Sequence, residues 1–210
     1  MSSPPDVFTL IHIGKCGGST VSSVLEAHRV RFHRTHMTRV RFDPAKRYVI
    51  VIRNPIQRFV SAFHWRYKLV VVDKTQKGRF RGEAETLEHY GNANTLAETI
   101  DTFNIHTSYI HHIKEDISYH LRDFLASACS TTKKDCIRGV ITTEHLNEDV
   151  KTLFGVDNTI HEKRNSLEKP ALSPLGRANL RKYLEKDYEC IDTLYKMGCL
   201  TEDQYAVLSE

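Results

Sequence analysis

The chain has 210 residues, of which 40% are hydrophobic and 27% charged, and its formal net charge is +4 at pH 7. This ordinary composition excludes a disordered or collagen-like chain, and five cysteines without a C-x-x-C pair predict neither a disulfide framework nor a zinc site. No apolar run is long enough to span a bilayer and no signal peptide is recognisable, which predicts a soluble cytoplasmic protein. A luminal fragment cut from a membrane anchor would look the same and is kept as an alternative.

The first third of the chain alternates predicted strands and helices. After a flexible tail at residues 1–6, residues 7–13 have the apolar, β-branched character of a buried strand, and a helix is expected to end near residue 27. Residues 30–38 are predicted to be extended. Residues 47–53 form the clearest buried strand, and residues 55–67 form a helix that opens on a proline.

The rest of the chain predicts a polar, lid-like loop near residues 73–93 and helices near 94–103 and 108–128. A further strand is expected at residues 137–143, followed by a helix, and apolar residues return at helical spacing over 177–196. This order predicts a single α/β domain over residues 7–210. It should have three layers and a mostly parallel central sheet of about five strands.

The first motif, GKCGGST, follows the strand at residues 7–13. Its glycines let successive backbone N–H groups point toward one ligand, and the N-terminus of the following helix favours an anion. The residue order is that of neither a Walker A loop nor a G-x-G-x-x-G loop, and a tight turn whose glycines only serve packing is the alternative reading. The candidate anion-binding residues are Gly14, Lys15, Cys16, Gly17, Gly18, Ser19 and Thr20.

The second motif, RNPIQRFVS, begins where the strand at residues 47–53 ends. Arg53 needs a partner, because an unpaired buried charge is costly, and a phosphate is a suitable one. Ser61 follows two helical turns later. An arginine paired with a nearby acid and an exposed serine are the alternative reading. Since ligands bind at the carboxyl ends of parallel strands, both motifs are expected in one crevice.

Together the two motifs resemble the donor-binding elements of the sulfotransferases. The first is similar to their 5′-phosphosulfate loop, P-K-[ST]-G-[GS]-[ST]-[ST]. The second is similar to their 3′-phosphate motif, R-x-P-x-x-R-x-x-S, and matches it at Arg53, Pro55, Arg58 and Ser61. The chain resembles the carbohydrate-type branch, including the heparan sulfate 2-O-sulfotransferases, more than the cytosolic phenol and steroid type.

Two positions of the first motif depart from the family pattern. Gly14 stands where the family has proline, which should loosen the loop. Cys16 stands where the family has serine or threonine, which removes one hydroxyl donor. Both departures are expected to weaken binding of the donor without abolishing it.

The resemblance implies a P-loop-like fold that binds 3′-phosphoadenosine 5′-phosphosulfate and releases adenosine 3′,5′-bisphosphate. Lys15 and the backbone of residues 17–20 would hold the 5′-phosphate and the bridging oxygen, so Lys15 is both a cofactor-binding and a catalytic candidate. Arg53 and Ser61 would hold the 3′-phosphate, with Arg58 in the same cofactor-binding set.

Transfer to a hydroxyl needs a base that removes its proton. In the similar 2-O-sulfotransferases a histidine lies between the two motifs, and residues 32–37 occupy that stretch. Strand alternation puts His36 on the face of Phe32 and His33 on the other face, so His36 is preferred over His33. Glu83, in the lid-like segment, is the runner-up, with a solvated loop carboxylate as its alternative reading. The remaining candidates are His111, His112 and Glu144.

The acceptor is predicted only by class. A basic stretch suits an acidic glycan, although a protein tyrosine, a glycolipid and a small alcohol are also consistent with the sequence. No metal-ligand spacing is recognisable, so no metal is expected, and nucleic acid is not the expected partner. A non-catalytic polyanion or nucleic-acid binder and a P-loop nucleotide kinase-like enzyme are the competing hypotheses. The basic stretch comprises Arg29, Arg31, Arg34, Arg39, Arg41, Lys46 and Arg47.

Overall fold

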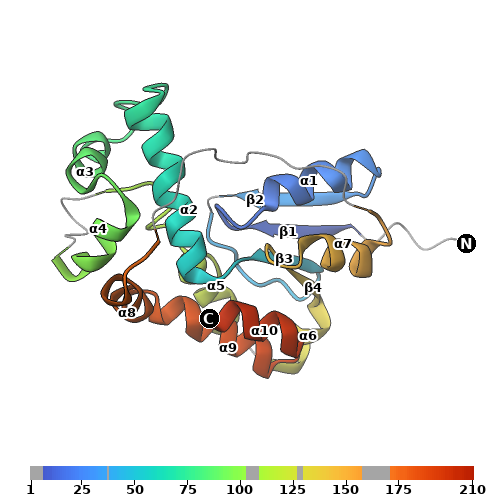
Figure 1. The fold of residues 1–210 in the computed structure, drawn as a ribbon. Coiled ribbons are helices and arrows are strands. Elements are labelled where there is room, and N and C mark those ends of the chain that lie inside the picture. Colours follow the sequence, from blue (N-terminus) through green and yellow to red (C-terminus); the bar gives the residue numbers. More distant parts are fainter. Residues whose placement is uncertain (1–6, 37, 103–108, 127–129, 158–170) are drawn as a thin grey trace, which may run out of the picture.

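The computed structural model describes residues 7–36, 38–102, 109–126, 130–157 and 171–210. The tail expected at residues 1–6 lies outside these ranges. The described part of the chain is an α/β structure with a parallel sheet flanked by helices, as Figure 1 shows. Within these ranges, no helix is long and apolar enough to cross a membrane.

The sheet has four parallel strands in the order β2-β1-β3-β4. The two central strands, β1 (Phe8–His12) and β3 (Tyr48–Ile52), are buried at every residue, and such strands are apolar along their whole length rather than alternating. The edge strands are β2 (Phe32–His36) and β4 (Ile137–Thr142). The predicted α/β class and parallel sheet are confirmed, with four strands in the described residues where about five were expected.

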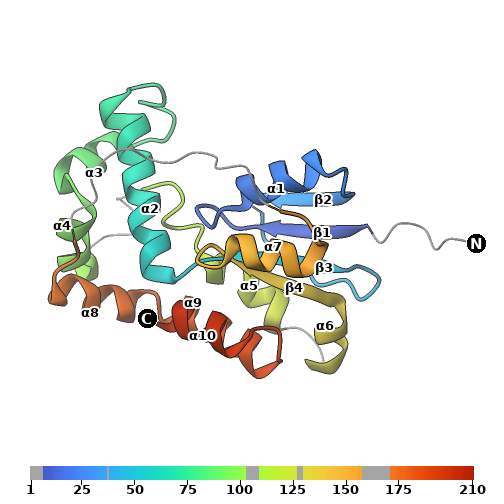
Figure 2. The ribbon, with the colours of Figure 1, turned by 45° about the vertical axis from the view of Figure 1, so that its right-hand side comes forward.

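Helices cover both faces of the sheet, which gives the three layers that the sequence predicts. Figures 1 and 2 show α1 and α7 on one face and α5, α9 and α10 on the other. The bounds of these helices are Gly18–Ala27 (α1), Leu146–Phe154 (α7), Ile117–Ala126 (α5), Glu185–Lys196 (α9) and Glu202–Ser209 (α10).

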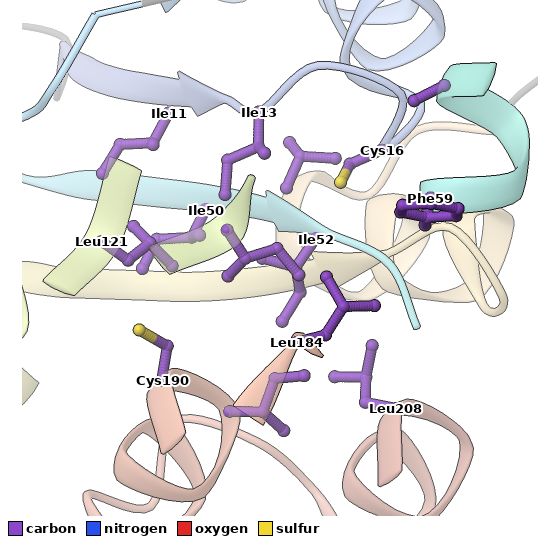
Figure 3. Close-up of a cluster of buried hydrophobic side chains, with 14 of the residues drawn as sticks. Ile11, Ile13, Cys16, Ile50, Ile52, Phe59, Leu121, Leu184, Cys190 and Leu208 are labelled. Carbon is purple, nitrogen blue, oxygen red and sulfur yellow. The ribbon is translucent and has the colours of Figure 1, made fainter. Parts of the chain in front are cut away.

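The core on the second face holds the sheet against α5, α9 and α10. In Figure 3 the side chains of Ile11 and Ile50 point from the sheet toward Leu121, and Leu184 and Leu208 lie below the end of β3. Each of these five residues is at most 2% exposed. Complete burial of such a side chain contributes about 1.5–3 kcal/mol, so this layer holds the helices against the sheet.

The remaining helices lie beyond the carboxyl ends of the strands or at the periphery. Helix α2 leaves β3 as expected: Asn54 caps it by accepting a hydrogen bond from the Gln57 backbone N–H at 3.0 Å, and Pro55 is its first residue. The other bounds are Pro55–Tyr67 (α2), Lys68–Val72 (a π-helical turn), Glu83–Tyr90 (α3), Ala93–Glu98 (α4), Ile100–Thr102 (a 3₁₀ turn), Ser130–Cys136 (α6) and Pro174–Tyr183 (α8).

Two predicted segments differ from the structure for tertiary reasons. Residues 73–93 are not one loop, because α3 forms over Glu83–Tyr90 and its first residue is tied to Arg66 of α2. The helix predicted over 108–128 begins only at Ile117, where the Asp187 carboxylate accepts its first N–H groups.

The C-terminal prediction missed a break and a helix. The leucine spacing over 177–196 runs through two helices, which are separated at Leu184. The spacing continues across this break because both α8 and α9 bury an apolar side in the same core. Helix α10 is too short to show a clear period. Its signal is the sequence TEDQ, a capping box in which Thr201 and Gln204 satisfy each other's backbone groups.

Candidate active site

The first motif forms a tight turn between β1 and α1. Lys15 and Gly17 have φ angles of 70° and 81°, and a left-handed lysine is uncommon enough to mark a functional constraint. Gly18 has no room for a side chain, because an added Cβ would lie 2.1 Å from Cδ2 of His12. Helix α1 therefore begins directly at the loop, with its N-terminal N–H groups at the carboxyl end of β1.

The side chain of Cys16 faces the core and not the loop surface. Its thiol is fully buried, in the cluster of Figure 3, and burial raises the pKa of this thiol to about 12. A hydroxyl at this position would be buried among apolar side chains. The cofactor-binding role predicted for Cys16 can therefore involve its backbone but not its side chain.

The second motif lies beside the first, as the sequence predicts. Thr143, directly after β4, donates from its hydroxyl to the backbone oxygens of Cys16 at 2.8 Å and Ile52 at 3.2 Å. The Lys15 ammonium also lies 4.3 Å from the ring centroid of Trp65 on α2. The carboxyl ends of β1, β3 and β4 thus form one locus.

Arg53 extends from the end of β3 at this locus. Its side chain is 20% exposed, and its Nε lies 3.9 Å from Oε1 of Glu144. That distance is too long for a hydrogen bond, and Nε has no hydrogen-bond partner among the described residues. Glu144 instead accepts the backbone N–H of Asn54 at 3.1 Å, and burial raises the pKa of its carboxyl group. Arg53 therefore keeps an unused donor. Ser61 is half-buried further along α2.

Arg58 has a different environment from the one expected for a cofactor ligand. Its side chain is completely buried, and Nη2 donates to the backbone oxygens of His112, at 2.5 Å, and of Glu115. The carboxylates of Asp187 and Asp116 are its charged neighbours. These contacts fix the loop at residues 111–116 from inside the protein. Nε and Nη1 have no hydrogen-bond partner among the described residues, and a role of Arg58 in cofactor binding stays a prediction.

The two histidines of β2 lie at opposite ends of the sheet. His36 pairs with His12 at the carboxyl end, and their ring centroids are 4.3 Å apart. His33 is exposed and pairs with Thr9 toward the amino end. There it lines an open pocket of about 490 Å³ together with Val7, Glu26 and neighbouring residues of β2. The structure thus brings His36, and not His33, to the locus of the two motifs.

Glu83 is a buried ion-pair partner and not a solvated loop carboxylate. It accepts from Nε and Nη2 of Arg66 at 2.9 and 2.6 Å and from the backbone N–H of His111 at 2.7 Å. Both charged side chains are at most 2% exposed. A carboxylate occupied by three donors in the interior does not fit a general base.

His112 reaches the locus from a turn that the sequence assigned to a helix. It has a φ of 69°, its backbone N–H donates to Oε2 of Glu115 at 2.8 Å, and its ring lies 6.4 Å from that of His36. Burial, helped by the neighbouring His111, Arg58 and Lys15, lowers the pKa of His112 to about 2, against an opposing effect of Glu115. The imidazole is therefore neutral over the physiological range.

This low pKa makes His112 a source of acid sensitivity. Below pH 6.5 the unfolded chain protonates this histidine while the folded chain does not, so the free energy of unfolding should fall by about 1.4 kcal/mol per pH unit. Above pH 6.5 both states are neutral and the contribution is constant. Urea unfolding of the wild type and of His112→Asn at pH 7.5, 6.5 and 5.5 should show that the free energy of unfolding falls less with acidification in the variant. An equal fall in both proteins would contradict the role of His112 in acid sensitivity.

Sequence reasoning missed two residues of this locus, His12 and Thr143, and had His112 only among several candidate bases. His12 is the last residue of β1 and Thr143 directly follows β4, and a polar residue at the carboxyl end of a parallel strand was a usable signal. His112 had no such signal, since its position depends on Arg58 holding its carbonyl. In the part of the chain that the structure describes, no group of three or more His, Cys, Asp or Glu side chains is placed to hold a metal ion.

The unpaired polar atoms at the locus fit an anionic ligand. Among the described residues, Nε of Arg53 and Nδ1 of His112 are buried and lack a hydrogen-bond partner. Buried polar atoms are rarely left in this state, so a ligand with several acceptor oxygens is the chemistry that would satisfy them. The N-terminus of α1 and the ammonium of Lys15 favour the same charge.

Comparison with known proteins gives one family. The model of a family described as "Sulfotransferase family" matches residues 1–196. No curated protein and no solved structure matches the chain. The match covers both motifs, all four strands and the helices up to α9, and it ends before α10.

Proposed function

The chain belongs to the sulfotransferase family, and we propose that it transfers a sulfuryl group from 3′-phosphoadenosine 5′-phosphosulfate to a carbohydrate hydroxyl. The observation that carries this proposal is the meeting of both donor-type motifs at one edge of the sheet, joined by Thr143. The donor supplies an activated sulfuryl group attached to a phosphate leaving group.

The residues that would hold the donor divide into two sets. Lys15 and the backbone N–H groups of residues 17–20 suit the 5′-phosphate, because a glycine turn and a helix N-terminus favour an anion there. Arg53, with its unused Nε, and Ser61 suit the 3′-phosphate. The long contact between Arg53 and Glu144 supports this assignment, since a phosphate offers Arg53 a better partner than a carboxylate 3.9 Å away.

His36 is the proposed general base. Its Nδ1 lies 3.3 Å from the backbone oxygen of His12, and a carbonyl oxygen only accepts hydrogen bonds. We therefore assign the ring proton to Nδ1, which makes Nε2 the nitrogen that would accept the proton of the acceptor hydroxyl. A base positioned in this way typically contributes about 10²- to 10⁴-fold to the rate.

An acidic glycan is the proposed acceptor. The basic stretch from Arg29 to Arg47 includes the edge strand that carries His36, and its seven basic side chains are all exposed. Two of them have acidic partners, Asp123 for Arg39 at 3.5 Å and Asp43 for Lys46 at 3.3 Å. The excess of positive charge beside the proposed base favours an acceptor that carries negative charge.

Binding of adenosine 3′,5′-bisphosphate tests the donor site. At 100 times its Kd the ligand adds about 2.7 kcal/mol of stability, which for a domain of this size raises Tm by roughly 5–11 °C. Arg53→Ala should weaken binding by roughly ten- to a hundred-fold, since charge-assisted hydrogen bonds contribute about 1.5–3 kcal/mol each. Thermal unfolding with the bisphosphate, with AMP and with ATP plus magnesium measures both effects.

The matched control is Arg47→Ala, because Arg47 precedes the same strand that Arg53 follows. It should bind the bisphosphate as the wild type does. An equal Tm shift with AMP, or an unchanged shift in Arg53→Ala, would contradict the donor site. A shift with ATP and magnesium alone would favour the nucleotide kinase-like hypothesis. If the bisphosphate binds, transfer of labelled sulfate to a panel of acidic and neutral glycans then identifies the acceptor.

A further inference from the structure

The contact between His112 and Gly14 joins the first motif to a segment almost one hundred residues away. A Cβ added to Gly14 would lie 2.5 Å from Nδ1 and 3.1 Å from Cε1 of the His112 ring. Gly14 is not among the residues with a positive φ, so its backbone conformation does not itself require glycine. The small residue is needed because the imidazole occupies the space where a side chain would be.

The backbone of His112 is fixed independently of its ring. Its carbonyl oxygen accepts from the buried guanidinium of Arg58, and its N–H donates to Glu115. The ring of His111 lies 4.2 Å from that of His112. The left-handed φ of 69° thus persists because charged groups hold the turn on both sides, and the ring is kept against the loop.

The ring is within reach of both halves of the proposed reaction. It touches Gly14, the neighbour of Lys15, and its centroid lies 6.4 Å from that of His36. Its Nδ1 is buried and has no hydrogen-bond partner among the described residues.

We propose that His112 is a further residue of the transfer site, whose imidazole donates a hydrogen bond to the sulfuryl group of the donor. The inference rests on the proposed function. A neutral imidazole donates through one nitrogen without adding a charge next to Lys15, and a sulfuryl group offers three acceptor oxygens. Gly14 and His112 act as a pair in this arrangement, since the glycine makes room for the ring.

Comparing two ligands that differ only in the sulfuryl group tests the contact. We expect His112→Ala to weaken binding of 3′-phosphoadenosine 5′-phosphosulfate by about 10- to 100-fold and to change that of adenosine 3′,5′-bisphosphate by less than about three-fold. His112→Asn should recover most of the loss, because its amide overlaps the Nδ1 position and asparagine tolerates a left-handed backbone. Isothermal calorimetry of the wild type and both variants gives the six affinities.

His89→Ala is the matched control, since His89 is exposed on α3. Equal losses for both ligands in His112→Ala would mean that the residue only supports the fold of the loop, and unchanged affinities would mean that it does not touch the donor. Either result overturns the inference and leaves the proposed function standing. A wild type that binds neither ligand overturns the proposed function and, with it, the sulfuryl contact.

A ligand-free measurement tests the Gly14–His112 pair on its own. Gly14→Ala should lower Tm by about 2–12 °C, because its Cβ overlaps the ring. In the His112→Ala background the same substitution should lower Tm by less than about 2 °C, since the ring is gone. Additive losses in the double variant would show that Gly14 is not reserved for the imidazole, and would overturn the pair.

Discussion

Glu83→Ala should lower the free energy of unfolding by about 3–5 kcal/mol, because it leaves the guanidinium of Arg66 buried without its carboxylate. Arg66 and Glu83 are 2% and 1% exposed, so water cannot replace the lost partner. The pair also joins α2 to α3 and to the turn before α5, since Glu83 accepts from the backbone of His111. For a domain of this size we expect Tm to fall by roughly 6–20 °C.

A surface ion pair that includes another glutamate of α3 is the control for this prediction. Glu88 and Lys77 lie 3.8 Å apart and are about half exposed, at 51% and 53%. Glu88→Ala should therefore cost less than about 1 kcal/mol. Chemical unfolding of both variants decides between a structural and a catalytic Glu83. A loss below about 1 kcal/mol in Glu83→Ala would contradict the ion-pair role and restore the glutamate-base hypothesis.

Arg58→Met should lower the free energy of unfolding by as much as Glu83→Ala, because Arg58 is a buried cation near two acidic side chains. Asp187 caps α5 by accepting from the backbone N–H groups of Ile117 at 3.3 Å and Ser118 at 2.7 Å. Burial and the nearby Asp116 raise the pKa of Asp187, and Arg58 opposes them. Removing Arg58 leaves two carbonyl oxygens without a donor and the acids without compensation, so we expect a loss of about 3–5 kcal/mol at pH 8.

The pH dependence separates this mechanism from simple loss of packing. In the wild type the pKa of Asp187 is already raised to about 8, and without Arg58 it rises further. Below about pH 7 both folded proteins keep this proton, whereas above about pH 8 only the variant does, so only the variant continues to lose stability as the pH rises. Arg58→Met should therefore lose more at pH 9.5 than at pH 6, and adding Asp187→Asn should remove that difference. A loss independent of pH would contradict the role of Asp187.

Arg122→Met is the control for Arg58, since Arg122 is an exposed arginine of α5 whose side chain is 56% exposed. It should change the free energy of unfolding by less than about 1 kcal/mol. Donor binding adds a second readout, because Arg58 anchors the carbonyl of His112. Because His112 is proposed to contact the sulfuryl group, Arg58→Met should weaken binding of the phosphosulfate more than binding of the bisphosphate.

The sequence alone determined the features that depend on neighbouring residues. Central strands β1 and β3 are continuous apolar runs because both faces are buried, and each is followed by a motif whose residues are contiguous. Parallel strands place such motifs at one edge whatever the rest of the fold does. The α/β class, the sulfotransferase resemblance, and the placement of Lys15, Arg53 and His36 at one locus follow from these local patterns.

The tertiary structure decided what depends on partners distant along the chain. Glu83 and Arg58 carry charges whose roles are set by Arg66 and by Asp187, and a sequence does not show which charges are buried together. His112 lies at the donor loop only because Arg58 holds its turn and Gly14 leaves it room. A buried charge and a close approach acquire their meaning from the atoms across the contact, so local periodicity cannot reveal them.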